Sequence, residues 1–142
     1  LESNYPNIDL YGIDVARLVI ENFTKRHLTN SNLRSGHLVD AIDWKGFDVI
    51  YSYGVIHHMY PREIELFAKS AADKLLPDGV VHLYFANRAR IFDIVYSRFH
   101  IRYPDFYLKR LFKKYGLFLK DSSPLLGRPD LFTNFMVFEK HR

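Results

Sequence analysis

The sequence has no cysteine, which excludes a disulfide framework, a thiolate zinc site and a cysteine nucleophile. Its apolar runs are too short for a membrane-spanning helix, and no basic segment followed by an apolar one marks a signal peptide. We therefore expect a cytoplasmic protein without a membrane partner. Because residue 1 is Leu rather than Met, we also expect the numbered chain to begin inside a longer protein.

Glycine is sparse, and none of the seven glycines forms a G-x-G pair. Within these residues that excludes a dinucleotide-binding fingerprint and a phosphate-binding P-loop. The chain also lacks the G-x-S-x-G turn of α/β-hydrolases. It has no Tyr followed four residues later by Lys, which argues against a short-chain dehydrogenase. The common nucleotide and hydrolase motifs are thus absent from the sequence.

What is present suffices for one domain, since 48% of the 142 residues are hydrophobic and 16% are aromatic. The net charge is +4, but residues 88–142 carry 12 Lys or Arg against 5 Asp or Glu. This basic end predicts either an ordinary solvated surface or the attraction of an anionic partner. No aromatic RNA-binding motif, GXXG loop or zinc finger accompanies it, so we expect no nucleic-acid partner.

Apolar segments of strand and helix type alternate along the chain, which predicts an α/β fold with a mostly parallel sheet. Polar residues 29–35 indicate a loop, and Pro77–Gly79 a turn. The expected strands are residues 8–13, 37–39, 47–52, 80–86, 117–119 and 132–138. One helix is expected directly after Asp14, and three more are expected at residues 61–75, 89–100 and 104–115.

Three acids fall where predicted strands end: Asp14, Asp40 and, less clearly, Asp43. Ligands of open α/β sheets bind outside the carboxyl ends of the strands, and a carboxylate there can accept both hydroxyls of a ribose. Each acid can equally be a helix N-cap or a turn former. The pattern leaves both interpretations open.

His57 and His58 are the one histidine pair. Adjacent residues on a helix point about 100° apart, so they chelate one metal ion poorly. No third ligand stands at a standard spacing, and we expect no metal site. The pair is then interpreted as one histidine that packs in the core or on the side of a bound ligand, or as a general base.

The segment Phe47–His58 resembles the fourth-strand motif "FDVI-x-S-x-x-V-L-H-H" of class I (Rossmann-like) S-adenosylmethionine-dependent methyltransferases. Four further pieces resemble the same family in the right order. They are Tyr11–Asp14 (second strand and its acid), Asp40-Ala41 (after the third strand), Leu75–Val81 (the turn into the fifth strand) and Leu108–Leu117 (the last helix entering strand six).

The resemblance implies a Rossmann-like sheet with helices on both faces, S-adenosylmethionine as cofactor and a small-molecule methyl acceptor. It implies that Asp14 binds the ribose hydroxyls, Val15 packs on the adenine, Asp40 accepts from the adenine amino group and Ala41 offers its backbone. Ser52 and Tyr53 would lie by the methionine part. The candidates for a catalytic group are His57, His58 and Tyr53.

The family's first motif, an acidic residue and a glycine-rich turn after strand one, is missing. We therefore expect residues 1–142 to be a partial methyltransferase domain from strand two onward, without the N-terminal strand–helix unit. Residues 88–103 are a possible acceptor-side insertion, with aromatic and arginine side chains that suit an aromatic or acidic small molecule. The alternative function is a methyltransferase-like domain that serves binding or structure without catalysis.

In the family, the missing strand lies between the strands expected at residues 8–13 and 47–52. A sheet with that slot left open would expose unpaired backbone amides. Either the two strands pair directly, or a segment outside these residues or a second copy of the chain completes the sheet.

Overall fold

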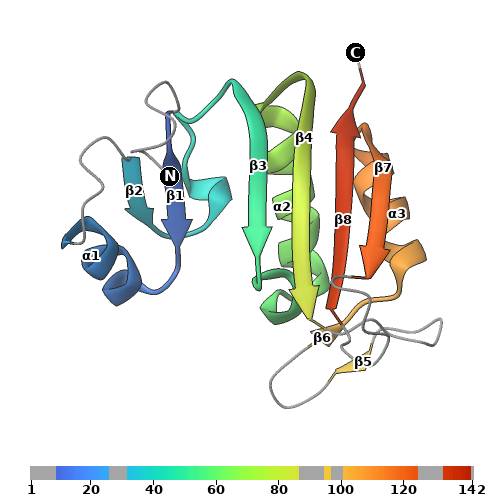
Figure 1. The fold of residues 1–142 in the computed structure, drawn as a ribbon, viewed down its shortest axis with the longest axis horizontal. Coiled ribbons are helices and arrows are strands. Elements are labelled where there is room, and N and C mark those ends of the chain that lie inside the picture. The colour runs from blue at the N-terminus through green and yellow to red at the C-terminus, as the bar shows by residue number, and fades with distance from the viewer. Residues whose placement is uncertain (1–8, 26–31, 87–94, 97–100, 125–132, 142) are drawn as a thin grey trace. The chain divides into compact units, whose positions relative to one another are not determined.

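The computed structural model describes residues 9–25, 32–86, 95–96, 101–124 and 133–141 (Figure 1). The chain divides into two compact units, Leu1–Ile42 and Asp43–Arg142. Both contain helices and strands, so the predicted α/β class is confirmed. In the described ranges, no helix combines the length and the apolar character that crossing a membrane requires.

The first unit is built on a two-stranded parallel sheet. Strand β1 (Tyr11–Asp14) is followed by helix α1 (Arg17–Lys25) and strand β2 (Asn32–Ser35). The last residue of β1, Asp14, lies opposite Ser35, the last residue of β2. Both strands therefore end at the same edge of the sheet.

The prediction of a strand at residues 37–39 is wrong, because Leu38–Asp40 forms a 3₁₀ turn, η1. The strand lies earlier, within the segment predicted as a loop. Its sequence, Asn-Leu-Arg-Ser, contains one apolar side chain and so lacks the pattern of a strand. The segment becomes a strand because it pairs with β1.

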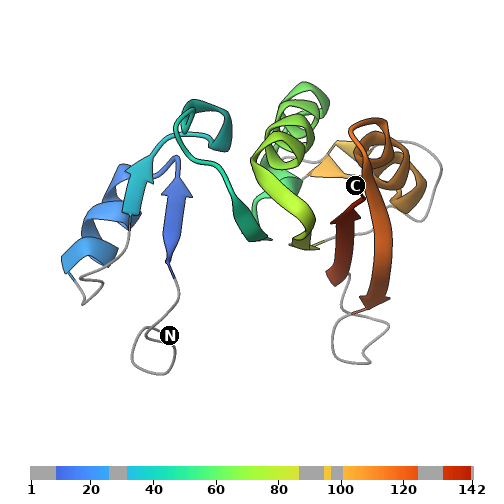
Figure 2. The ribbon, with the colours of Figure 1, turned by 90° about the horizontal axis from the view of Figure 1, so that it is seen from above.

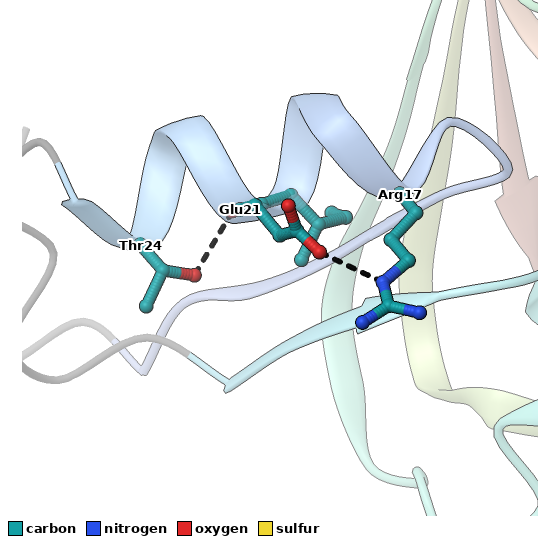
Figure 3. A network of polar contacts seen from close by, with 4 residues as sticks. Arg17, Glu21 and Thr24 are labelled. Carbon is teal, nitrogen blue, oxygen red and sulfur yellow. Dashed lines mark hydrogen bonds and ion pairs between the residues drawn. The ribbon is translucent and has the colours of Figure 1, made fainter.

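Polar contacts run along the exposed side of helix α1 (Figure 3). Arg17 Nε donates to Glu21 Oε1 at 2.7 Å, and Thr24 Oγ1 donates to the carbonyl of Ile20 at 2.9 Å. An exposed pair at this spacing stabilises a helix by about 0.3–0.5 kcal/mol. These contacts support the predicted helix locally.

The second unit is a four-stranded sheet in the order β3-β4-β8-β7. Strands β3 (Phe47–Tyr53) and β4 (Leu75–Ala86) are parallel, whereas β8 (Thr133–Lys140) runs antiparallel to both β4 and β7 (Leu117–Pro124). Two helices, α2 (Pro61–Lys74) and α3 (Asp105–Lys114), connect them. These elements confirm the strands expected at residues 47–52 and 80–86 and the helices at 61–75 and 104–115.

The turn expected at Pro77–Gly79 is an irregularity inside the long strand β4. The register with β3 jumps from Phe47↔Leu75 to Val49↔Val80, and Asp78 has a φ of 65°. A Cβ at Gly79 would lie 3.0 Å from the carbonyl oxygen of Phe47. Only glycine lets the two backbones approach this closely.

The prediction of a helix at residues 89–100 is wrong at residues 95–96, the part of that range that the structure describes. Val95–Tyr96 (β5) pairs antiparallel with Ile101–Arg102 (β6), which makes a short hairpin. The remainder of that expected helix lies outside the described residues. Its apolar spacing fits a helix and a twisted hairpin equally well, because the segment is short.

Both helices of the second unit pack on one face of its sheet (Figure 2). That face is fully buried at Val81, Leu83 and Phe85 of β4, and the ring of Phe112 from α3 stacks on Phe138 of β8 at 4.4 Å. Each such side chain contributes about 1.5–3 kcal/mol when it leaves water. This layer is the core of the unit.

The opposite face, which we call the open face, carries Val49, Tyr51, Tyr53, His82, Tyr84 and Phe135. The three side chains of β3 on it are 53–63% exposed, although β3 is an apolar strand. No described helix of this unit lies on that side (Figure 2). Among the described residues, β3 pairs with β4, and β1 pairs with β2 in a separate sheet.

Two sets of hydrogen bonds connect helix α2 to other elements of this unit, one from strand β8 and one from the end of helix α3. Lys140 Nζ, at the end of β8, donates to the carbonyls of Ala72 and Leu75 at 2.6 and 2.8 Å, which caps the carboxyl end of α2. Glu65 of α2 accepts hydrogen bonds from Lys114 Nζ at 2.5 Å and from the Tyr115 hydroxyl at 2.7 Å. These donors hold the pKa of Glu65 below its ordinary value of 4.5.

A Glu65→Gln substitution should lower the free energy of unfolding at neutral pH, because it removes the charge that Lys114 pairs with. A carboxyl group whose pKa is lowered by folding stabilises the fold above its unfolded pKa and loses that effect as pH falls through the folded pKa. The difference between wild type and Glu65→Gln should therefore shrink below pH 4.5. Urea unfolding across this range measures it, with exposed Asp73→Asn as control. A difference that stays constant with pH would contradict the assignment.

Candidate functional site

Asp14 ends β1 and forms the turn that leads into α1. Its Oδ1 accepts a hydrogen bond from the backbone N–H of Ala16 at 2.7 Å. Its second oxygen, Oδ2, has no donor among the described residues. The turn-former interpretation therefore accounts for one oxygen and leaves the other for a ligand.

Asp40 lies at the end of η1, close to the same edge. Its Oδ2 accepts from the backbone N–H of His37 at 2.9 Å. The link to Asp14 is Gly36, whose N–H donates to the Asp14 carbonyl at 3.0 Å and whose Cβ, if it had one, would lie 3.3 Å from Asp40 Oδ2. We call this group of Asp14, Gly36 and Asp40 the acid corner.

The two neighbours of these acids differ in exposure. Val15 is 64% exposed directly after Asp14, so an apolar surface adjoins the acid corner. Ala41 is buried, and its N–H donates to the Leu38 carbonyl at 3.3 Å. The backbone group expected to meet a ligand at Ala41 is thus already engaged within η1. Asp43 belongs to the second unit and is exposed.

Ser52 and Tyr53 end β3 but lie on opposite faces of its sheet. Ser52 is only 6% exposed on the helix side, and its Oγ has no hydrogen-bond partner in the described part of the chain. Tyr53 is on the open face, where its ring stacks on Tyr84 at 4.3 Å with an interplanar angle of 3°. The structure therefore does not bring the two side chains together.

Tyr84 is a neighbour that the sequence did not single out. Desolvation and the Tyr53 hydroxyl raise the pKa of Tyr84 above its usual value of 10.0, so its phenol stays protonated at neutral pH. The stack follows from the register Tyr53↔Tyr84. Only the pairing of β3 with β4 reveals it.

His57 and His58 lie in the 3₁₀ turn η2 (Ile56–His58), which follows β3. His57 is 7% exposed, while His58 is exposed, and their rings are 4.1 Å apart. The burial of His57 matches the core-packing interpretation of the pair. Across the described ranges, no group of three His, Asp or Glu side chains could hold a metal ion.

The segment expected to form an acceptor-side wall is described only in part. Tyr103 is buried and its hydroxyl donates to the carbonyl of Met59 at 2.6 Å, which holds the end of β6 against the loop after η2. Phe92, Phe99, Arg88, Arg90 and Arg98 lie outside the described residues. Tyr103 is thus an anchor of the fold, and sequence alone does not separate such an anchor from a pocket wall.

No protein-family model and no curated protein sequence matches this chain. Solved structures do. A methyltransferase from Clostridium acetobutylicum that depends on S-adenosylmethionine is 10% identical, with a TM-score of 0.75 over 100% of this chain and 80% of that one. A TehB-like S-adenosylmethionine-dependent methyltransferase from Corynebacterium glutamicum is 19% identical, with a TM-score of 0.70 over 93% of this chain and 68% of that one.

A third structure is the 1,6-didemethyltoxoflavin-N1-methyltransferase of Burkholderia thailandensis with bound 1,6-didemethyltoxoflavin and S-adenosylhomocysteine. It is 13% identical, with a TM-score of 0.72 over 100% of this chain and 75% of that one. At such identities the likeness shows the fold alone. The chain has the Rossmann-like fold of class I methyltransferases, as the motif resemblance implies.

The unpartnered Ser52 hydroxyl leads to a stability prediction. A buried hydroxyl without a partner opposes folding, so Ser52→Ala should raise the free energy of unfolding of the ligand-free protein by about 1 kcal/mol. Exposed Ser122→Ala is the matched control and should have no effect. Thermal and urea unfolding measure both. Destabilisation by Ser52→Ala would show that the hydroxyl already has a partner in the fold.

Proposed function

We propose that this chain binds S-adenosylmethionine and takes part in methyl transfer to a small-molecule acceptor. The observation that carries the proposal is the acid corner. Asp14 and Asp40 stand at the carboxyl edge of a parallel strand pair, joined through Gly36, and each uses one carboxylate oxygen within the fold. Ligands of open α/β sheets bind at this edge.

The donor groups of an adenosine fit what the acid corner offers. Asp14 Oδ2 would accept from the ribose hydroxyls, and Asp40 would accept from the adenine amino group. Hydrogen bonds to a charged acceptor contribute about 1.5–3 kcal/mol each. Exposed Val15 supplies an apolar surface on which the adenine ring would pack. This assignment concerns the first unit alone.

At the end of β3 the second unit offers the buried hydroxyl of Ser52 and the exposed phenol of Tyr53. The resemblance assigns both to the methionine part of the cofactor. When bound, the cofactor supplies an electrophilic methyl group on a sulfonium. The protein's own contribution is alignment of the acceptor and, where the acceptor needs one, a base. His57, His58 and Tyr53 remain the candidates for that base.

The acceptor is proposed to meet the segment 88–103. The described end of this segment is anchored by Tyr103 on Met59, directly after η2. That contact supports an acceptor-side role, because it keeps the segment beside the loop that carries His57 and His58. Its arginines and aromatic residues suit an aromatic or acidic small molecule.

A non-catalytic methyltransferase-like domain is the second candidate function. The lack of a G-x-G turn in these residues favours it, because such a turn would supply backbone donors to the cofactor. A methyl-labelled cofactor incubated with a small-molecule extract separates the two candidates. Label in a small product supports the enzyme, and cofactor binding without transfer supports the second candidate.

Substitution of Asp14 tests the cofactor proposal. Asp14→Asn keeps an oxygen that can accept from the Ala16 N–H but loses the charge, whereas Asp14→Ala loses both. Both variants should weaken binding of S-adenosylhomocysteine to the full-length polypeptide by about tenfold or more in calorimetry. Only Asp14→Ala should also lose about 1 kcal/mol of stability, because it removes the hydrogen bond from the Ala16 N–H. Exposed Asp73→Asn is the control. Unchanged affinity in Asp14→Asn would remove Asp14 from the site.

We further propose that another strand pairs with the outer edge of β3 and that its connecting helix covers the open face. Apolar β3 side chains that are 53–63% exposed, on a strand with one described partner, support this. A polypeptide limited to residues 1–142 should then self-associate and bind a hydrophobic dye.

Light scattering on size-exclusion fractions measures this self-association. Tyr51→Lys should reduce it, because it places a charge on the open face. Tyr60→Lys is the matched control, since Tyr60 is 63% exposed but lies outside the sheet. A polypeptide of residues 1–142 that stays monomeric and binds no dye would contradict the proposal.

A further inference from the structure

Two consecutive residues surround the carboxylate of Asp40. The backbone N–H of His37 donates to Asp40 Oδ2 at 2.9 Å, and the α-carbon of Gly36 faces the same oxygen. A Cβ on Gly36 would stand 3.3 Å from Oδ2 and 3.9 Å from the Asp40 Cβ. The carboxylate therefore has a donor on one side, and on the other a methyl group added at Gly36 would displace it.

Gly36 also reaches the other acid. Its N–H donates to the Asp14 carbonyl at 3.0 Å, which continues the β1–β2 ladder one residue beyond Ser35. Its φ of 141° belongs to the region that side chains with L chirality rarely adopt. The backbone thus turns at the one point that contacts both Asp14 and Asp40.

We propose that the Gly36–His37 pair positions the Asp40 carboxylate and so sets the specificity of the acid corner for adenine over 6-oxopurines. This rests on the proposed function. A carboxylate that is held in place accepts a hydrogen bond from an exocyclic amino group. It meets a 6-oxo group, which is an acceptor, with repulsion and no hydrogen bond. Discrimination between adenine and a 6-oxopurine depends on the position of the Asp40 carboxylate. His37 fixes that position through its N–H, and Gly36 by its close approach.

The test compares binding of S-adenosylhomocysteine and of its 6-oxo (inosine) analogue to the full-length polypeptide. Wild type should prefer the adenine compound by about tenfold or more, the factor expected when a hydrogen bond to a charged group is lost. Gly36→Ala should weaken binding of the adenine compound about fivefold and that of the 6-oxo analogue less than about twofold. Gly116→Ala is the control for backbone strain, because Gly116 has a φ of 77° with open space around it.

A double-mutant cycle separates positioning from a general loss of structure. If Gly36 acts through Asp40, Gly36→Ala should change the affinity less than about twofold in an Asp40→Ala background, because coupled residues are not additive. Should Gly36→Ala fail to fold, His37→Pro replaces it in the cycle. This variant deletes the N–H that donates to Asp40 and leaves Gly36 unchanged.

Two results would overturn the inference while cofactor binding stands. One is equal weakening of both ligands by Gly36→Ala or His37→Pro, and the other is an undiminished effect in the Asp40→Ala background. If the wild-type polypeptide does not bind S-adenosylhomocysteine, the proposed function fails and the inference fails with it.

Discussion

The second unit depends on the pairing of strand β4 on both of its edges. β4 lies between β3 and β8, and its inward side chains Val81 and Leu83 are fully buried under the helices. The ladder continues past β3, since the N–H of Gly54 donates to the Tyr84 carbonyl at 2.8 Å. The loop that carries His57 and His58 therefore starts from a fixed point, and Tyr103 holds its far end through Met59.

The first unit has no comparable sheet. Two strands of four residues each are marginal on their own in water. What orders the acid corner is a set of hydrogen bonds from backbone N–H groups. Ala16 and His37 donate to the carboxylates of Asp14 and Asp40, and Gly36 donates to the Asp14 carbonyl. Both carboxylates are placed by their sequence neighbours, so a ligand there would meet an arrangement that exists before it binds.

Sequence reasoning succeeded where a segment's own pattern decides its structure. The apolar run at residues 47–52 and the stripe of α2 after Pro61 are such segments. It failed at β2, whose polar residues form a strand only because β1 pairs with them. It also failed at Val95–Tyr96, where partners five and seven residues beyond decide the conformation. Tertiary pairing overrides local propensity in both cases.

The residues of the candidate site also divide into those that the sequence could identify and those that it could not. Asp14 and Asp40 could be selected from sequence because acids at strand ends form a local pattern, and the structure places them at one edge. The separation of Ser52 from Tyr53 also follows from the two-residue period of a strand once β3 is assigned. Gly36 could not be selected, because its importance depends on contacts with two residues on different elements.

The position of β8 has a consequence for the order in which this protein assembles. The last strand along the chain lies between β4 and β7, and its Lys140 caps a helix whose end is 65 residues earlier. During synthesis, β4 and β7 have no common partner until the carboxyl-terminal strand leaves the ribosome. Such non-local pairing makes folding slow, because loop-closure entropy must be overcome before any contact compensates for it. The nascent chain therefore leaves one backbone edge of each of these strands unpaired at the stage when aggregation competes most strongly with folding.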